Sequence, residues 1–205
     1  MFKECGMIAV EDAWIFDIAD EPEIVRRNIT GCRFWVARKI DNCINSASIR
    51  KISNNEIESS ARVIRDSFST VVREFNLTPQ NCPSNPAFIT ADALIKIKEK
   101  GINMFGLFVS GIQIGFVAIE KADEKKYYME KLAIDPQYRH CGYGRMLMDY
   151  VVDFVQSHNG NKLSIGVINE NKVLKKWYND YGFKETGCKK FAHLPFTVRF
   201  MELEL

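Results

Sequence analysis

The stretch Arg139-His140-Cys141-Gly142-Tyr143-Gly144 decides the fold of this chain. It follows an apolar segment that ends at Ile134 and precedes an amphipathic segment that starts near Met146, so we expect a strand that turns into a helix. The first N–H groups of a helix have no partner within it and carry partial positive charge. Two glycines without Cβ allow a phosphate to approach that backbone closely. The turn therefore predicts an anion-binding site, to which the Arg139 and Arg145 side chains add charge.

The spacing disfavours two familiar nucleotide-binding loops. A dinucleotide fingerprint would need a third glycine at the position of Leu147. A phosphate-binding P-loop would need Gly-Lys-Ser/Thr, whereas Gly144 is followed by Arg145 and Met146. From the spacing alone, the open alternatives are a cradle for another phosphorylated ligand and a tight turn that needs two glycines only for its own geometry.

Periodicity on both sides of the turn predicts the remaining elements. Ser53-Asn54-Asn55-Glu56 has capping-box spacing ahead of an apolar stripe, and Thr90 and Gly101 bracket a second, shorter helix. Ser110-Gly111 is typical of a two-residue hairpin turn. The predicted order is β-α-α-β-β-β-α-β-α-β, with strands at 48–52, 104–109, 112–121, 127–134, 163–168 and 197–205, and the longer helices at 57–75, 146–158 and 173–181. This order favours an α/β (α+β) fold, a mixed sheet with helices on both faces.

Residues 1–47 form a separate segment that is hard to interpret. Residues 7–10 and 34–40 have strand-like character, and Pro22 is a suitable first residue of a short helix. Trp14 and Trp35 are unusual in a disordered arm, so we expect an N-terminal extension that folds and docks on a domain formed by residues 48–205.

Composition limits the partners. The formal charge of +2 over 205 residues gives no sign of a nucleic-acid groove or an anionic membrane partner. No apolar stretch approaches the ~20 residues of a membrane span, and the N-terminus lacks a signal-peptide pattern. Six cysteines occur singly without a CxxC pair, which is poor zinc spacing. We therefore expect a reduced, cytoplasmic protein without a metal.

Three segments together resemble the GNAT superfamily of N-acyltransferases over roughly residues 48–205. Arg139-x-x-Gly142-x-Gly144 matches the (Gln/Arg)-x-x-Gly-x-(Gly/Ala) signature, and Leu132-Ala133-Ile134 matches the strand edge before it. Asn171 to Phe183 matches N-x₆-Y-x₃-G-F. The resemblance implies a GNAT-like, mostly antiparallel sheet whose strands splay apart around acetyl-CoA. The cofactor-binding residues that it implies are Leu132, Ala133, Ile134, Arg139, His140, Cys141, Gly142, Tyr143, Gly144, Arg145 and Asn171.

The family reaction is direct attack of a neutral amine on the thioester. Tyr178 matches the tyrosine that serves many relatives as general acid, because a phenol is protonated at neutral pH. The alternative is a core tyrosine, since Leu174, Trp177 and Tyr181 share its helix.

The general base is less readable, because the stretch Ser164-Ile165-Gly166-Val167 lacks the glutamate of some relatives. Glu130 is our candidate: it precedes Leu132 by two residues and should share its face of the strand. The alternative is a solvent-facing charge, and His193 and then Glu120 are the next choices.

The resemblance therefore implies an acetyl-CoA-dependent N-acetyltransferase that acts on a small-molecule amine or a protein amino group. The alternative is a catalytically silent acetyl-CoA-binding or sensing module. The loop at 76–89 and the last hairpin, 186–198, would shape the acceptor site. The acceptor and the oligomeric state stay open, with a homodimer as one option. A covalent acyl-Cys141 is disfavoured, because no partner His or Asn is evident.

Overall fold

The computed structural model describes residues 47–205. The predictions made for residues 1–46 lie outside the described residues. The strands are β1 (Ala47–Lys51), β2 (Asn103–Val109), β3 (Ile112–Lys121), β4 (Lys126–Ile134), β5 (Lys162–Ile168), β6 (Lys184–Lys190) and β7 (Thr197–Glu204). The helices are α5 (Ile57–Glu74), α6 (Ala91–Glu99), α7 (Tyr143–Ser157) and α8 (Lys172–Tyr181).

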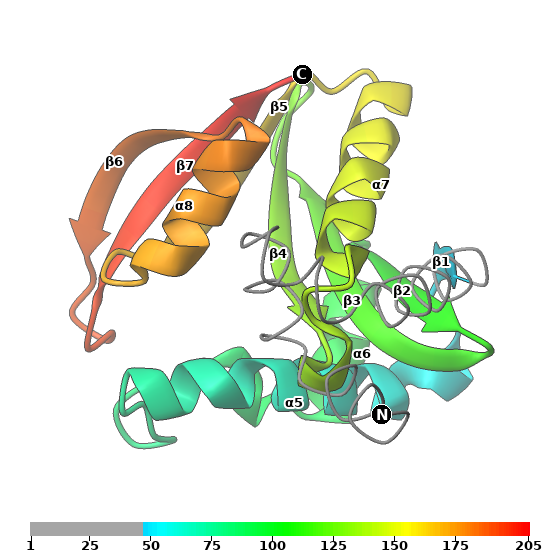
Figure 1. The fold of residues 1–205 in the computed structure, drawn as a ribbon, viewed down its shortest axis with the longest axis horizontal. Coiled ribbons are helices and arrows are strands. Elements are labelled where there is room, and N and C mark those ends of the chain that lie inside the picture. Colours follow the sequence, from blue (N-terminus) through cyan, green and yellow to red (C-terminus); the bar gives the residue numbers. More distant parts are fainter. Residues whose placement is uncertain (1–46) are drawn as a thin grey trace, which may run out of the picture.

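All seven strands of the described region form one mixed sheet in the order β1-β2-β3-β4-β5-β7-β6. Only β4 and β5 pair in parallel; the other neighbours are antiparallel. Apolar side chains of β2 and β3 pack with α5 and α6 on one face of the sheet and with α7 on the other. Figure 1 shows α8 lying beside β6 and β7, apart from α7. The predicted mixed sheet with helices on both faces is confirmed.

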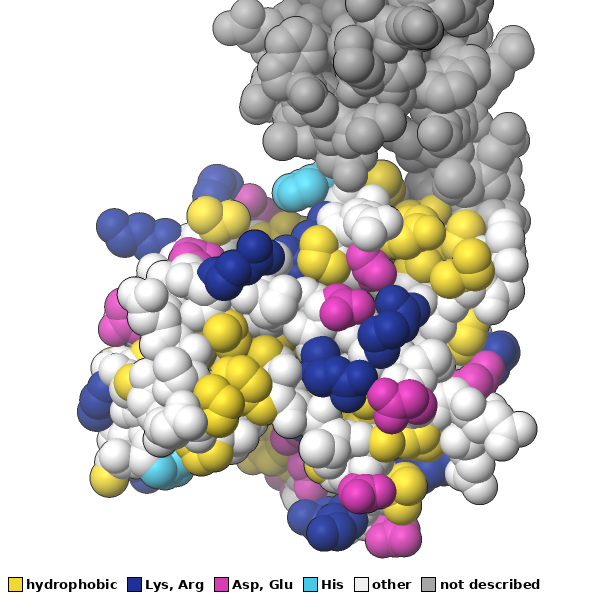
Figure 2. Space-filling view, turned by 90° about the horizontal axis from the view of Figure 1, so that it is seen from below, with side chains coloured by type: hydrophobic (Ala, Val, Ile, Leu, Met, Phe, Trp, Pro, Cys, Tyr) yellow, Lys and Arg dark blue, Asp and Glu magenta, His cyan; other side chains and the backbone are white. Residues whose placement is uncertain are grey.

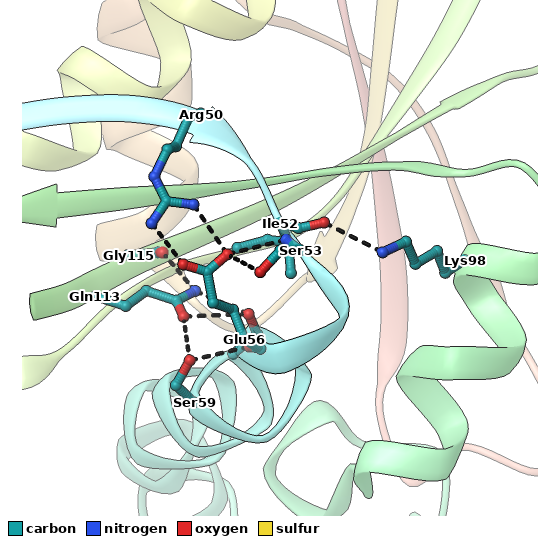
Figure 3. Close-up of polar contacts among 9 residues, drawn as sticks. Arg50, Ile52, Ser53, Glu56, Ser59, Lys98, Gln113 and Gly115 are labelled. Atoms are coloured by element: carbon teal, nitrogen blue, oxygen red, sulfur yellow. Dashed lines mark hydrogen bonds and ion pairs between the residues drawn. The ribbon is translucent and has the colours of Figure 1, made fainter. Parts of the chain in front are cut away.

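The predicted capping box fixes the start of α5. The Ser53 backbone N–H and hydroxyl both donate to the Glu56 carboxylate, at 2.9 and 2.6 Å, and Arg50 binds the same carboxylate in two places. Gln113 on β3 accepts from Ser59 at 2.7 Å. These contacts join β1, β3 and the start of α5 (Figure 3). They set the angle at which the helix leaves the sheet.

The predicted hairpin between β2 and β3 is confirmed, and its turn has the expected backbone. Ser110 and Gly111 both have positive φ, +51° and +82°. This is the type I′ arrangement, whose twist matches that of paired strands.

A β-bulge in β4 overturns one sequence expectation. Phe116 faces Ala133 and Ala118 faces Glu130, so two residues of β4 lie opposite the single residue between Phe116 and Ala118. Lys131, inside the bulge, has a φ of +54°. The extra residue reverses the alternation, so Leu132 packs on the α7 side whereas Glu130 lies on the α5 side with Ala118. The prediction that Glu130 and Leu132 share a face is wrong.

Two further boundaries differ from the prediction. Helix α7 begins at Tyr143, three residues before the expected start, because Gly142 already serves as its N-cap. Strand β6 was not predicted. Its sequence, Lys-Glu-Thr-Gly-Cys-Lys-Lys, lacks apolar alternation, and its residues are exposed or half-exposed because it is the edge strand of the sheet.

The surface seen from below mixes charges of both signs, with lysine or arginine beside aspartate or glutamate at several places (Figure 2). Within residues 47–205, none of the helices combines the length and apolar character that a membrane crossing requires.

Candidate active site

The parallel strands β4 and β5 separate partway along their length. They pair at only three positions, the last of which is Tyr128 with Ser164. Beyond that point β4 continues to Ile134 along β3, and β5 continues to Ile168 along β7. Figure 1 shows the resulting divergence, with β5, β6, β7 and α8 leaning away from β4. Ala133 and Ile134 pair with β3, whereas the side of β4 that faces β5 has no partner strand beyond Tyr128. The resemblance implies that the pantetheine arm pairs with Leu132 to Ile134.

The turn that opens this site has the backbone expected of an anion cradle. His140 and Gly142 have positive φ, +61° and +82°, and Gly142 is the N-cap of α7. The first bond of the helix runs from the Met146 N–H to the Gly142 carbonyl at 3.0 Å. The N–H groups of Gly144 and Arg145 precede it and therefore have no acceptor within the helix. A Cβ on Gly144 would lie 3.7 Å from Trp177, an ordinary contact, so the positive φ makes Gly142 the stricter glycine.

The Arg139 side chain does not extend toward this turn as the sequence suggested. Its guanidinium donates to the Ser67 carbonyl at 2.7 Å and to the Thr70 hydroxyl at 3.1 Å on α5, and to the Ile134 carbonyl at 3.3 Å. Burial lowers the pKa of this guanidinium. Arg139 therefore ties the turn to α5, and it contributes to the predicted cradle through its backbone and position.

The other side chains of the turn divide between the interior and the surface. Tyr143 is buried, with its ring 6.5 Å from that of Tyr138, and Cys141 is half-buried against the same core. His140 and Arg145 are exposed. Arg145 lies over the Tyr181 ring at 5.1 Å and 3.9 Å from the Asp149 carboxylate. Arg145 is thus a charged side chain at the mouth of the cradle.

Asn171 has a defined structural role at the start of α8. Its side chain is buried and accepts a hydrogen bond from the Leu174 N–H at 2.9 Å, which makes it the N-cap of the helix. A contact between Asn171 and a bound ligand stays a prediction.

Tyr178 is a buried residue of α8. The ring makes edge contacts with Trp177 and Phe183, at 4.9 and 5.3 Å between centroids, and the residue is only 5% exposed. In the described region every fully buried side-chain nitrogen or oxygen has a partner, and the Tyr178 hydroxyl bonds to none of the described residues. The phenol therefore lies in a desolvated environment without a hydrogen-bond partner among the described residues. Burial raises the pKa of the phenol above its ordinary value, so Tyr178 is a proton donor at neutral pH.

A pocket of about 380 Å³ lies where β4 and β5 begin to diverge. Its lining comes from four strands: Lys126, Tyr128, Met129 and Glu130 of β4, Ser164, Ile165 and Gly166 of β5, Thr186 and Gly187 of β6, and Phe200 and Glu202 of β7. Glu130 is thus in the cleft, although on the opposite face from that of Leu132. Its carboxylate is 39% exposed and lies 2.6 Å from the Lys131 ammonium.

Glu202 is a pocket carboxylate that the sequence did not single out. It pairs with Ser164 in the sheet and accepts a hydrogen bond from the Ser164 hydroxyl at 2.7 Å. The Lys126 ammonium lies 2.5 Å from the same oxygen. The Lys126 and Ser164 hydrogen bonds lower the pKa of Glu202. Glu202 therefore places a carboxylate beside β5, and only the sheet order could reveal that pairing.

The two weaker base candidates do not line this pocket. His193 is exposed in the loop between β6 and β7, 5.7 Å from the Phe191 ring. Glu120, near the end of β3, pairs with Tyr128 across the β3–β4 ladder. Of the three base candidates from the sequence, only Glu130 lines the pocket.

A larger, shallower depression of about 440 Å³ lies along the outer side of α7, bordered by Gly142, Arg145, Met146, Asp149, Tyr150, Asp153 and Ile49. It begins at the same turn but lacks the strand divergence. The cleft between β4 and β5 is the better candidate site, because the diverging strands and the carboxylates Glu130 and Glu202 meet there.

Comparison with known proteins agrees with this geometry. Residues 70–183 match the model of the "Acetyltransferase (GNAT) family". A PaiA N-acetyltransferase from Thermoplasma acidophilum in complex with coenzyme A superposes with a TM-score of 0.66 at 20% identity, over 78% of this chain and 99% of that one. Ard1 from Thermoplasma volcanium gives 0.63 at 20% identity, over 78% and 98%.

The ribosomal-protein-S18-alanine N-acetyltransferase from Escherichia coli gives a TM-score of 0.61 at 15% identity, over 77% of this chain and 93% of that one. At these identities the solved structures establish the fold, while the family model covers more than half of the chain. The turn before α7, the divergence of β4 from β5 and the family match together show that this chain belongs to the GNAT family of acetyltransferases.

Proposed function

We propose that the protein transfers an acetyl group from acetyl-CoA directly to a primary amine. The observation that carries this proposal is the divergence of β4 and β5 beside the helix-opening turn at Gly142. The residues present fit acetyl-CoA: a positively polarised helix start suits a pyrophosphate, and unpaired strand backbone suits the amide groups of a pantetheine arm. Acetyl-CoA would supply the activated thioester.

In this proposal the turn binds the pyrophosphate through the N–H groups around Gly144, with Arg145 adding charge. The backbone of Leu132 to Ile134 aligns the pantetheine arm, with Asn171 nearby. Tyr178 holds a proton at its hydroxyl and donates it to the departing thiolate. Glu130 accepts a proton from the acceptor ammonium, directly or through water, before the neutral amine attacks.

A simple assay tests the proposal. The protein is incubated with acetyl-CoA and a panel of primary amines while free CoA thiol is measured. Thiol release that depends on both the amine and the protein is expected, together with a product heavier than the amine by one acetyl group. Thermal stabilisation by CoA, with no thiol release from any amine, would instead identify an acetyl-CoA-binding or sensing module. Stabilisation by ATP or NAD, and none by CoA, would exclude both.

A further inference from the structure

The depression along the outer side of α7 is a second surface of the domain, separate from the cleft between β4 and β5. It encloses about 440 Å³. One side is formed by Ile49 of the edge strand β1, and the other by Met146 and Tyr150 of α7. All three side chains are half-buried, and the Tyr150 ring is held by an edge contact with Phe105 at 5.0 Å. The depression therefore has apolar walls that suit an aromatic or aliphatic side chain.

The charged groups of the depression are divided between its two ends. Arg145 lies at the end next to the cradle, 3.9 Å from the Asp149 carboxylate, and Asp149 also accepts a hydrogen bond from Tyr181 at 2.5 Å. Asp153 lies one turn further along α7 and is exposed. None of the described residues forms a hydrogen bond or an ion pair with Asp153. The far end of the depression thus presents a carboxylate to an incoming basic side chain.

The N-terminal segment, residues 1–46, is covalently joined to the strand that borders this depression. Within β1, Lys51 lies opposite Phe105, whose ring contacts Tyr150 and Phe154 in the later turns of α7. The start of β1, at Ala47, therefore lies toward the cradle end of the depression. Residues 41–46 are rich in Asp, Asn and Ser, which favour a change of chain direction. A segment that reverses there runs along the depression toward its acidic end.

The part of the N-terminal segment that precedes this reversal is basic and aromatic. Residues 24–40 contain five Lys or Arg residues and no Asp or Glu, and residues 33–39 read Arg-Phe-Trp-Val-Ala-Arg-Lys. Lys39 stands eight residues before Ala47, a length of chain that spans at most roughly 25 Å. The rise of α7 from Met146 to Asp153 is only about 10 Å. The chain is therefore long enough to bring this stretch to the acidic end.

We propose that residues 33–39 of this chain bind in the depression along α7, with the Trp35 side chain between the apolar walls and the basic end of the stretch at Asp153. The proposal rests on complementary charge, on the apolar walls and on the point at which the segment joins β1. It assigns a place to the N-terminal segment and does not depend on the proposed acetyl transfer.

Protection from chymotrypsin tests the proposal on the full chain, because this protease cleaves after aromatic residues such as Phe34 and Trp35. Asp153→Arg should raise the initial rate of cleavage at these two residues by about 3-fold or more, since it replaces an attraction by a repulsion. Glu124→Arg makes the same change of charge in the exposed turn between β3 and β4 and should keep the wild-type rate. Mass spectrometry locates the first cuts, and an intact fragment that contains residues 47–205 verifies that the domain is folded.

A double-mutant cycle separates the proposed contact from a local effect on the protease. Exchange of Arg38 and Lys39 for glutamate should raise the same cleavage rate. Combination of this exchange with Asp153→Arg should bring the rate back toward the wild-type value, because the opposite charges face each other again. Any effect of the two glutamates on the protease itself is the same with and without Asp153→Arg.

The contrary outcomes are specific. An unchanged cleavage rate in Asp153→Arg, or two increases that simply multiply in the combined variant, would overturn the proposal. A wild-type chain that sediments as a dimer and becomes a monomer in Asp153→Arg would assign the depression to a second copy of the chain instead.

Discussion

Tyr178 combines a ring fixed in the core with a phenol hydroxyl that bonds to none of the described residues. The edge contacts with Trp177 and Phe183 hold the ring, so its position is fixed by packing and not by a hydrogen bond to the hydroxyl. The core interpretation of the sequence is confirmed by this packing, and the general-acid role stays a prediction. The raised pKa keeps the phenol protonated over the whole neutral range.

Replacement of Tyr178 by Phe should lower kcat by about 100-fold or more, the range of general acid catalysis, and leave the affinity for CoA nearly unchanged. The reason is that the ring contacts stay and only the proton donor is lost. Steady-state kinetics and a CoA titration measure the two quantities. Tyr181→Phe is the matched control, because Tyr181 is on the same helix as Tyr178 and has no proposed catalytic role. Its hydroxyl donates to the Asp149 carboxylate on α7 at 2.5 Å. Parallel losses of kcat and CoA affinity would mark Tyr178 as packing only.

The two pocket carboxylates show how far residue-level prediction extends. Glu130 could be named from its spacing to Leu132, but its face could not, because the bulge at Lys131 depends on how β4 pairs with β3. Glu202 stands next to Ser164 only because β7 lies between β5 and β6. Local spacing predicts which residues lie in a segment; the neighbours across a sheet come from long-range pairing.

At the scale of elements, the turn before α7 divides its two arginines between different tasks. Arg139 binds α5 and the end of β4, whereas Arg145 stays exposed beside the helix start. The arginine at the start of the family signature is therefore a structural tie in this chain. The exchange of either arginine for methionine separates these roles.

Arg139→Met should lower the free energy of unfolding by about 1–3 kcal/mol, since it removes several hydrogen bonds from a charged, half-buried group. Arg145→Met should change it by no more than about 0.5 kcal/mol but weaken CoA binding several-fold, with the difference shrinking at high salt. Urea unfolding and CoA titration at two salt concentrations measure these effects. A larger loss of stability in Arg145→Met than in Arg139→Met would contradict the assignment.

Helices and strands whose apolar side chains recur at regular intervals could be predicted from the sequence. Elements without such periodicity could not. Helices α5 and α8 and strands β2 to β5 follow the expected boundaries within a few residues, because each packs at least one face into a core. Strand β6 escaped prediction because both of its faces are largely exposed and its pairing partner, β7, supplies the order. Apolar periodicity detects a strand only where that strand covers a core.

At the scale of the molecule, helix α5 is held at its start by β1 and along its later turns by the turn before α7. Arg139 holds its later turns to the cradle, and Glu56 holds its start to β1 through Arg50. The helix thus links the β1 edge of the sheet to the anion-binding turn (Figures 1 and 3). The free energy of the Glu56 contacts contributes to the stability of the whole domain, because a small domain unfolds cooperatively.

Glu56 makes that stability depend on pH. Hydrogen bonds from Arg50 and Ser53 lower its pKa from 4.5 to about 2 in the folded protein. Because the folded pKa lies below the unfolded one, the stabilisation is complete above the ordinary pKa and is lost as the pH falls toward about 2. Glu202 and Asp123 have pKa values lowered in the same direction, so the wild-type protein should lose stability steadily over this acid range.

The comparison with Glu56→Gln isolates the contribution of this one carboxylate. The urea midpoint of the variant should lie below that of the wild-type protein at pH 6. The gap should narrow as the pH falls toward about 2 and close only below it, where Glu56 is protonated in both states of the wild-type chain. Glu58→Gln, with a side chain 70% exposed beside Arg65, should show only a small gap throughout, as is usual for a surface ion pair. A Glu56→Gln gap that stays constant with pH would show that the capping box acts through its geometry rather than through its charge.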